Sequence, residues 1–156
     1  MVTEKSPGVN LDRQTRTLDI ILLILRVAIG IIMAAHGAQK LFGLFGGMGL
    51  AATVGFLGPV GYLVTIGEFF GGLGIIFGFL VRFSAASLIV IQIGAIVKVH
   101  WANGFFLGAK PGFEYNMALI AILLALLIAG PGRYAIISWL ESLLPKGLKK
   151  IVPFVR

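Results

Sequence analysis

The chain has 156 residues, of which 58% are hydrophobic and 12% charged, whereas about a quarter of the residues of a soluble domain are charged. This composition excludes an ordinary soluble domain, and the apolar residues are gathered into runs long enough to cross a bilayer. The 13 Lys+Arg outnumber the 6 Asp+Glu and cluster near the chain ends beside apolar runs, which favours anionic lipid headgroups over nucleic acid as the partner. The sequence has no cysteine, which excludes cysteine-ligated clusters and covalently attached c-type haem, so we expect no covalent cofactor.

The apolar runs predict an all-α fold, a four-transmembrane-helix bundle that forms one membrane domain over residues 18–134. Residues 1–17 are predicted to be a flexible polar cytoplasmic tail, and the first span covers about residues 18–42. A glycine-rich connection follows at residues 43–58. It should lie at the interface or against protein, because irregular backbone exposed to lipid would leave its amides unsatisfied.

Three further spans are predicted at about residues 60–80, 84–101 and 113–129. A very short turn joins the second span to the third, so these two should be antiparallel neighbours. Gly130-Pro131-Gly132 ends the fourth span.

Residues 135–156 mix apolar and basic side chains, which predicts a C-terminal amphipathic interfacial segment on an anionic leaflet. Basic loop residues favour an N-in/C-in orientation, with both termini cytoplasmic. We expect the protein to lie in the plasma membrane of a prokaryote. The inner side would then hold Lys5, Arg13, Arg16, Arg82, Arg133, Lys146, Lys149, Lys150 and Arg156, and the outer side Lys40, Lys98 and Lys110.

Small residues recur along the spans, which predicts close helix packing. The stripes are Gly30, Ala34 and Gly37 in the first span, and Gly67, Gly71, Gly74 and Gly78 in the second. Ionisable residues extend these packing faces, and we expect an ion pair between Arg26 and Glu68 near mid-membrane. The pair could serve function, or it could only neutralise two charges in a low dielectric.

A second polar group falls toward the outer ends of the spans and comprises His36, Lys40, Lys98, His100, Asn103 and Glu114. Together with Arg26 and Glu68, it forms the candidate ligand-binding cluster. The simpler alternatives are that the lysines extend to headgroups and that His36 makes an interhelical hydrogen bond. Haem and metal are not expected, because no span carries a pair of histidines facing a second pair. The aromatic residues of the outer loop predict an interfacial belt or the mouth of a site for a flat apolar ligand; they are Trp101, Phe105, Phe106, Phe113 and Tyr115.

These residues also form a recognisable pattern across residues 18–134. It comprises Arg26 with Gly30, His36-Gly37-Ala38-Gln39-Lys40-Leu41-Phe42, Glu68 before Gly71-Gly72, Arg82, His100 with Asn103-Gly104-Phe105, Glu114, and Gly130-Pro131-Gly132-Arg133-Tyr134. The chain resembles the DoxX family of small four-helix membrane proteins. The resemblance implies a role in respiratory or sulfur-compound redox chemistry, where related subunits belong to quinone-linked oxidoreductases.

Three functions remain open from the sequence. The first is a quinone-interacting subunit of a respiratory or sulfur-compound oxidoreductase, with quinone as a non-covalent cofactor. The second is a non-catalytic accessory subunit of a larger membrane redox complex, and the third is a small proton or solute conductor that uses Arg26 and Glu68. A homo-oligomer is the alternative to a larger complex.

Overall fold

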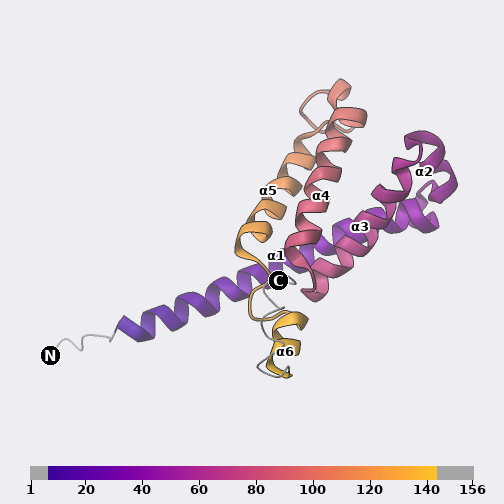
Figure 1. Cartoon of the computed structure of the whole chain (residues 1–156). Coiled ribbons are helices and arrows are strands. Elements are labelled where there is room, and N and C mark those ends of the chain that lie inside the picture. Colours follow the sequence, from indigo (N-terminus) through magenta and orange to yellow (C-terminus); the bar gives the residue numbers. More distant parts are fainter. Residues whose placement is uncertain (1–6, 144–156) are drawn as a thin grey trace.

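The computed structural model describes residues 7–143, and within this range all regular structure is helical (Figure 1). The α-helices are α1 (Pro7–Phe42), α2 (Gly49–Leu57), α3 (Val60–Phe77), α4 (Val81–Ala95), α5 (Glu114–Ala129) and α6 (Ile136–Leu143). A short 3₁₀ turn (Leu44–Gly46) precedes α2, and α4 continues through a π-helical turn (Ile96–His100) and a 3₁₀ turn (Trp101–Asn103). The all-α prediction is therefore confirmed for the described residues.

Helix α1 begins at Pro7, eleven residues before the predicted start at Leu18. Proline suits a first helical turn because its missing N–H has no partner there in any case. The expected flexible tail is therefore helical from Pro7 onward, and this part of α1 extends beyond the other helices, with residues 11–18 exposed (Figure 1). The sequence did not predict this part of the helix, because its residues are mostly polar and form no apolar run.

Helix α3 runs antiparallel along the C-terminal half of α1, and α4 packs mainly against α5 (Figure 1). The backbones of α1 and α3 approach so closely that a Cβ atom added at Gly37 would overlap Phe69, and one added at Gly72 would overlap Ala34. Small residues therefore set the α1–α3 contact, as predicted. The α3 glycine against α1 is Gly72, however, whereas Gly71 faces Leu88 of α4.

Three helical segments are long and apolar enough to cross a membrane: Leu11–Phe42, Val60–Phe77 and Val81–Asn103. Helix α5 is a shorter apolar helix of 16 residues. The structure thus has three helices able to span a membrane, while a fourth crossing by α5 and the orientation of the termini remain predictions.

The turn between α3 and α4 lies at residues 78–80, three residues before its predicted place. Gly78 ends α3 with φ 74° and Leu80 precedes α4 with φ 51°, so both adopt the left-handed conformation that reverses the chain. Val81, which was expected in the turn, is fully buried.

A buried core joins α1, α3, α4 and α5 and is built from Ile29, Met33, Ile75, Val81, Ala85, Leu88, Leu119, Leu123 and Leu126. It includes a chain of hydrogen bonds across three helices. Asn116 Nδ2 donates to Gln92 Oε1 at 2.7 Å, and Gln92 Nε2 donates to Met33 Sδ at 3.4 Å. These amides satisfy one another inside an apolar interior, which fixes how the α4–α5 pair meets α1.

The predicted C-terminal amphipathic segment is described only as far as α6. The rest of residues 135–156, including Pro145 and the basic residues after it, lies outside the described residues.

Candidate functional site

Lys40 near the end of α1 forms an ion pair with Glu68 of α3, with 2.5 Å between Lys40 Nζ and Glu68 Oε2. The Glu68 side chain is 5% exposed and that of Lys40 is 27% exposed. A carboxylate that is nearly enclosed in an apolar bundle needs such a partner, because an unpaired charge there is costly.

The predicted Arg26–Glu68 ion pair is wrong. The antiparallel contact sets Gly30 against Gly72 and Gly37 against Phe69, so the neighbours of Glu68 on α1 lie near its C-terminal end. By the same register Arg26 lies near Gly78, where α3 ends. Ten residues separate Glu68 from Gly78, about 15 Å along a helix, which is too far for the two side chains to pair.

Arg26 is 1% exposed and bonds to backbone in place of a carboxylate. Its Nη2 donates to the carbonyl oxygen of Tyr134 at 2.5 Å, while Nε and Nη1 have no partner among the described residues. The guanidinium lies beside the C-terminal end of α3, where unpaired carbonyls carry partial negative charge that favours a cation. Arg26 is thus a closed structural contact rather than part of an open site.

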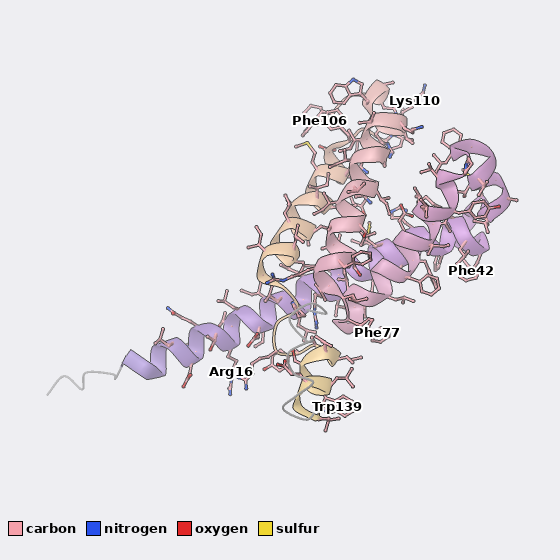
Figure 2. The ribbon with its side chains drawn as sticks, in the orientation of Figure 1. Arg16, Phe42, Phe77, Phe106, Lys110 and Trp139 are labelled. Carbon is pink, nitrogen blue, oxygen red and sulfur yellow. The ribbon has the colours of Figure 1, made fainter. Side chains whose placement is uncertain are left out.

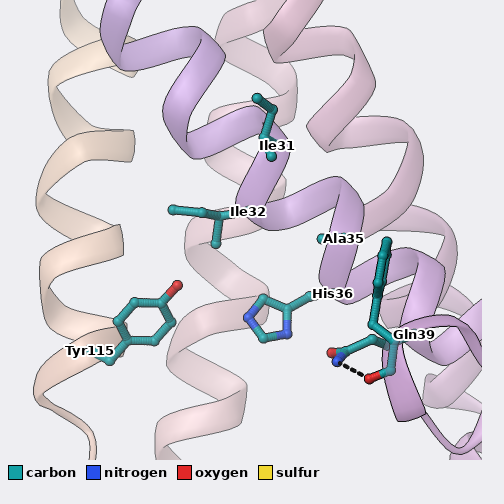
Figure 3. Close-up of a pocket in the computed structure, with 7 residues that line it drawn as sticks. Ile31, Ile32, Ala35, His36, Gln39 and Tyr115 are labelled. Carbon is teal, nitrogen blue, oxygen red and sulfur yellow. Dashed lines mark hydrogen bonds between the residues drawn. The ribbon is translucent and has the colours of Figure 1, made fainter.

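A hollow of about 320 Å³ lies between α1 and the start of α5 (Figure 3). Its walls are Ile31, Ile32, Ala35, His36, Gln39, Phe45 and Tyr115. Figure 3 shows the His36 ring directed toward Tyr115, and the ring centroids are 6.5 Å apart. Helix α1 therefore supplies most of the wall, and α5 contributes one aromatic side chain.

Two polar groups in this hollow have no hydrogen bond to any other described residue. They are the His36 ring nitrogens and the Tyr115 hydroxyl, whereas Gln39 Nε2 donates to the carbonyl of Phe45 at 3.4 Å. His36 and Tyr115 can therefore each offer a donor or an acceptor to a molecule that enters. Lys40, four residues after His36 on α1, pairs with α3 and does not line the hollow.

The remaining candidate residues hold the loop between α4 and α5. His100 Nδ1 lies 2.9 Å from the carbonyl oxygen of Pro111, and Asn103 Nδ2 donates to the same oxygen at 3.0 Å. Glu114 Oε1 accepts the backbone N–H of Leu107 at 2.7 Å. The structure does not bring these residues to the hollow, and Lys98 is exposed, with no hydrogen bond or ion pair to a described residue.

The aromatic residues of this loop pack on one another. Trp101 stacks on Phe113 with an interplanar angle of 12°, and Phe105 meets Phe113 edge-on. Of the aromatic group named from the sequence, Tyr115 alone reaches the hollow. Two buried polar residues were not named from the sequence, Gln92 and Asn116, and Gln39 was named only as part of the recognisable pattern. Their position within apolar spans was the signal available, because amides there need partners.

Within residues 7–143, no three His, Asp or Glu side chains converge as a metal site.

Comparison with known proteins agrees with the pattern of residues. Residues 21–101 match the DoxX family. A curated relative named "Putative oxidoreductase CatD" from Bacillus subtilis is 33% identical over 104 residues, which cover 67% of this chain and 76% of the relative. Another, named "Inner membrane protein YqjF" from Escherichia coli, is 31% identical over 119 residues, which cover 76% of this chain and 90% of that protein. No solved structure matches the chain at a significant level. With its apolar spans and these relatives, the chain is a prokaryotic membrane protein that belongs to the DoxX family.

Proposed function

We propose that the chain is a quinone-interacting subunit of a membrane oxidoreductase, and that the quinone ring binds in the hollow between α1 and α5. The observation that carries the proposal is the nearness of His36 to Tyr115, two polar side chains that make no hydrogen bond to another described residue, in an otherwise largely apolar wall. A quinone is a flat apolar ring with a carbonyl oxygen at each side. It needs an apolar surface for the ring and hydrogen-bond donors for its oxygens, and His36 and Tyr115, whose ring centroids are 6.5 Å apart, are close enough to donate to the same oxygen.

The hollow also opens to the outside of the helices, as a lipid-soluble ligand requires. Ile31, Phe45 and Tyr115 are 56%, 74% and 38% exposed, so the wall continues onto surface that contacts acyl chains in a bilayer. A ligand with an isoprenoid tail can then bind its ring in the hollow and leave its tail in the lipid. The volume of about 320 Å³ falls within the range of small-ligand sites, about 300–1,000 Å³.

The Lys40–Glu68 pair lies one helical turn beyond His36 on α1 and would support chemistry at the ring. Reduction or oxidation of a quinone moves protons, and ionisable groups inside membrane proteins commonly serve as relays. The relative named as an oxidoreductase supports the class of reaction. The electron donor or acceptor would belong to a larger membrane redox complex, because this chain carries no cysteine for a cluster.

Binding of a quinone analogue to the purified protein tests the proposal. Tyr115→Phe keeps the ring and removes one hydroxyl, so it should weaken binding by about 0.5–1.5 kcal/mol, roughly 2- to 12-fold. His36→Ala should weaken binding by at least as much, since it also removes part of the wall. The matched control is Tyr62→Phe on α3, whose side chain is exposed and does not line the hollow.

If the analogue does not bind, or binds equally to all three variants and the wild type, the proposed site is wrong. Co-purification with an oxidoreductase at fixed stoichiometry, without quinone binding, would instead favour the accessory-subunit alternative.

A further inference from the structure

The segment that joins α1 to α2 has a backbone shaped by glycine. Four of the seven residues at positions 43–49, which we call the glycine turn, are glycines. Three of them are left-handed, since φ is 71° at Gly43, 74° at Gly46 and 75° at Gly49. Glycine adopts both signs of φ at little cost. The glycine turn can therefore change its backbone angles more easily than the helices on either side of it.

Phe45 lies in the middle of the glycine turn and is also left-handed, with φ 54° and ψ 33°. An aromatic residue is strained in this conformation, and such strain is concentrated at ligand contacts and switch regions. Packing does not compensate for it, because the side chain is 74% exposed and its ring pairs with no other aromatic ring within residues 7–143. The strained backbone thus holds an exposed ring in the wall of the hollow, where a ligand could supply the missing contact.

The two ends of the 3₁₀ turn are fixed on Gln39, whereas its middle is held loosely. The backbone N–H of Gly43 donates to the Gln39 carbonyl at 3.2 Å, and a Cβ atom added at Gly47 would overlap the same carbonyl oxygen. Residues 44–46 between them are exposed. Their hydrogen bond to the Gln39 side chain, drawn as a dashed line in Figure 3, is 3.4 Å long, which is weak. Residues 44–46 can therefore move while Gly43 and Gly47 act as hinges.

We propose that the glycine turn is a flap over the hollow, and that Phe45 closes on the face of the bound quinone ring. This inference rests on the proposed function. His36 and Tyr115 lie on helices and would hold the oxygens of the ligand, whereas Phe45 would stack on its ring. The ligand enters from the lipid while the flap is open, and the stacked ring of Phe45 keeps it bound.

Binding rates of decylubiquinone on the immobilised full-length protein, measured by surface plasmon resonance, test the flap. In Phe45→Ala the affinity should fall about 2- to 12-fold, the usual range for one aromatic contact. Dissociation should become faster, and so should association, because the ring no longer has to move aside. Phe45→Tyr keeps the aromatic ring and should restore both rates. The matched control is Leu44→Ala, an exposed residue of the same turn that does not line the hollow.

A spin label shows the motion of the flap directly. The chain has no cysteine, so Leu44→Cys places one label on the turn and keeps Phe45. In lipid vesicles the label should be mobile without ligand and several-fold slower with saturating decylubiquinone. The control is Phe106→Cys, which is as exposed as Phe45. Figure 2 shows Phe106 at the tip of the α4–α5 pair, away from Phe42 just before the turn, so its label should not respond.

The outcomes separate this inference from the function on which it rests. If the wild-type protein does not bind decylubiquinone, the proposed function is wrong and the flap with it. If Tyr115→Phe weakens binding but Phe45→Ala changes neither affinity nor rates, the flap alone is wrong. Faster dissociation in Phe45→Ala with unchanged association, and a label at position 44 that does not respond to the ligand, would make Phe45 a fixed wall and would also overturn the flap.

Discussion

Each end of the α1–α3 pair holds a charged residue of α1, and the two residues have different kinds of partner. At one end Lys40 bonds to Glu68, beside a hollow in which His36 and Tyr115 make no side-chain hydrogen bond to another described residue. At the other end Arg26 is enclosed by the end of α3 and the Tyr134 carbonyl, and no carboxylate lies within ion-pair distance among the described residues. A charge inside a membrane bundle therefore does not by itself mark a functional site. The open space and the unsatisfied groups beside it are the distinguishing features.

The largest effect is expected where Arg26 is most tightly enclosed. Gly78→Ala would add a Cβ atom that overlaps Arg26 Nη1, at a residue whose φ of 74° is left-handed. Left-handed strain and overpacking together should lower the free energy of unfolding by about 2–5 kcal/mol. Unfolding in mixed detergent and sodium dodecyl sulfate measures the loss. Gly43→Ala is the control, because Gly43 is also left-handed, with φ 71° and ψ 16°, but its added Cβ would meet no atom closer than 3.5 Å. It should cost only about 1–2 kcal/mol. Equal losses would show that the space around Arg26 is not tight.

Double-mutant cycles test more directly which of the two charged residues of α1 pairs with Glu68. Lys40→Met and Glu68→Gln should show a coupling energy of about 0.5–3 kcal/mol, since the two side chains contact each other. Arg26→Met combined with Glu68→Gln should be additive within about 0.5 kcal/mol, because these residues share no partner. The same unfolding assay measures both cycles. Coupling to Arg26 but not to Lys40 would restore the pairing first expected from the sequence.

A smaller effect is expected in the layer between the two ends. Asn116→Leu removes the hydrogen bond to Gln92 and leaves the Gln92 oxygen without its donor. Side-chain hydrogen bonds between membrane helices contribute about 0.6 kcal/mol on average and up to about 1.7, so we expect a loss in that range. Leu119→Ala, one turn along α5 in the apolar core, serves for comparison, with an expected loss of about 2–5 kcal/mol. An Asn116→Leu variant as unstable as Leu119→Ala would mean that the amide chain holds the helices together.

The smallest effect concerns the polar residues of the α4–α5 loop. His100→Phe and Asn103→Ala remove contacts to the Pro111 carbonyl but do not alter the hollow. Both variants should bind a quinone analogue as the wild-type protein does, in an equilibrium binding assay. A large loss of affinity in either one would move the site from α1 toward the loop.

The sequence predicted the elements better than their relative positions. Apolar runs located α3, α5 and the stop at Gly130, because run length and glycine act locally. Helix α1 was predicted too short, since the polar residues after Pro7 carry no apolar signal yet still form a helix. The small-residue stripe of α1 identified its face against α3, but the stripe predicted for α3 chose Gly71, whereas Gly72 makes the contact with α1.

That choice determines the candidate site. One residue along a helix rotates the contact by about 100°, and the register along the axis decides which charges meet. His36, Lys40 and Glu68 were named from the sequence, but the partner of Glu68 depends on a register that small residues leave open. Tyr115 was grouped with the aromatic belt, because its nearness to His36 requires α5 to lie beside α1, a contact between distant parts of the chain.

The most direct measurement of the central claim is where a quinone attaches. A photoreactive azido-quinone, irradiated with the protein in native-like lipid and mapped by mass spectrometry, should label the 31–39 stretch of α1 and the peptide around Tyr115. An excess of unlabelled quinone should prevent that labelling. Labelling confined to residues 98–111, or labelling that unlabelled quinone does not compete away, would contradict the assignment of the hollow as the ring site.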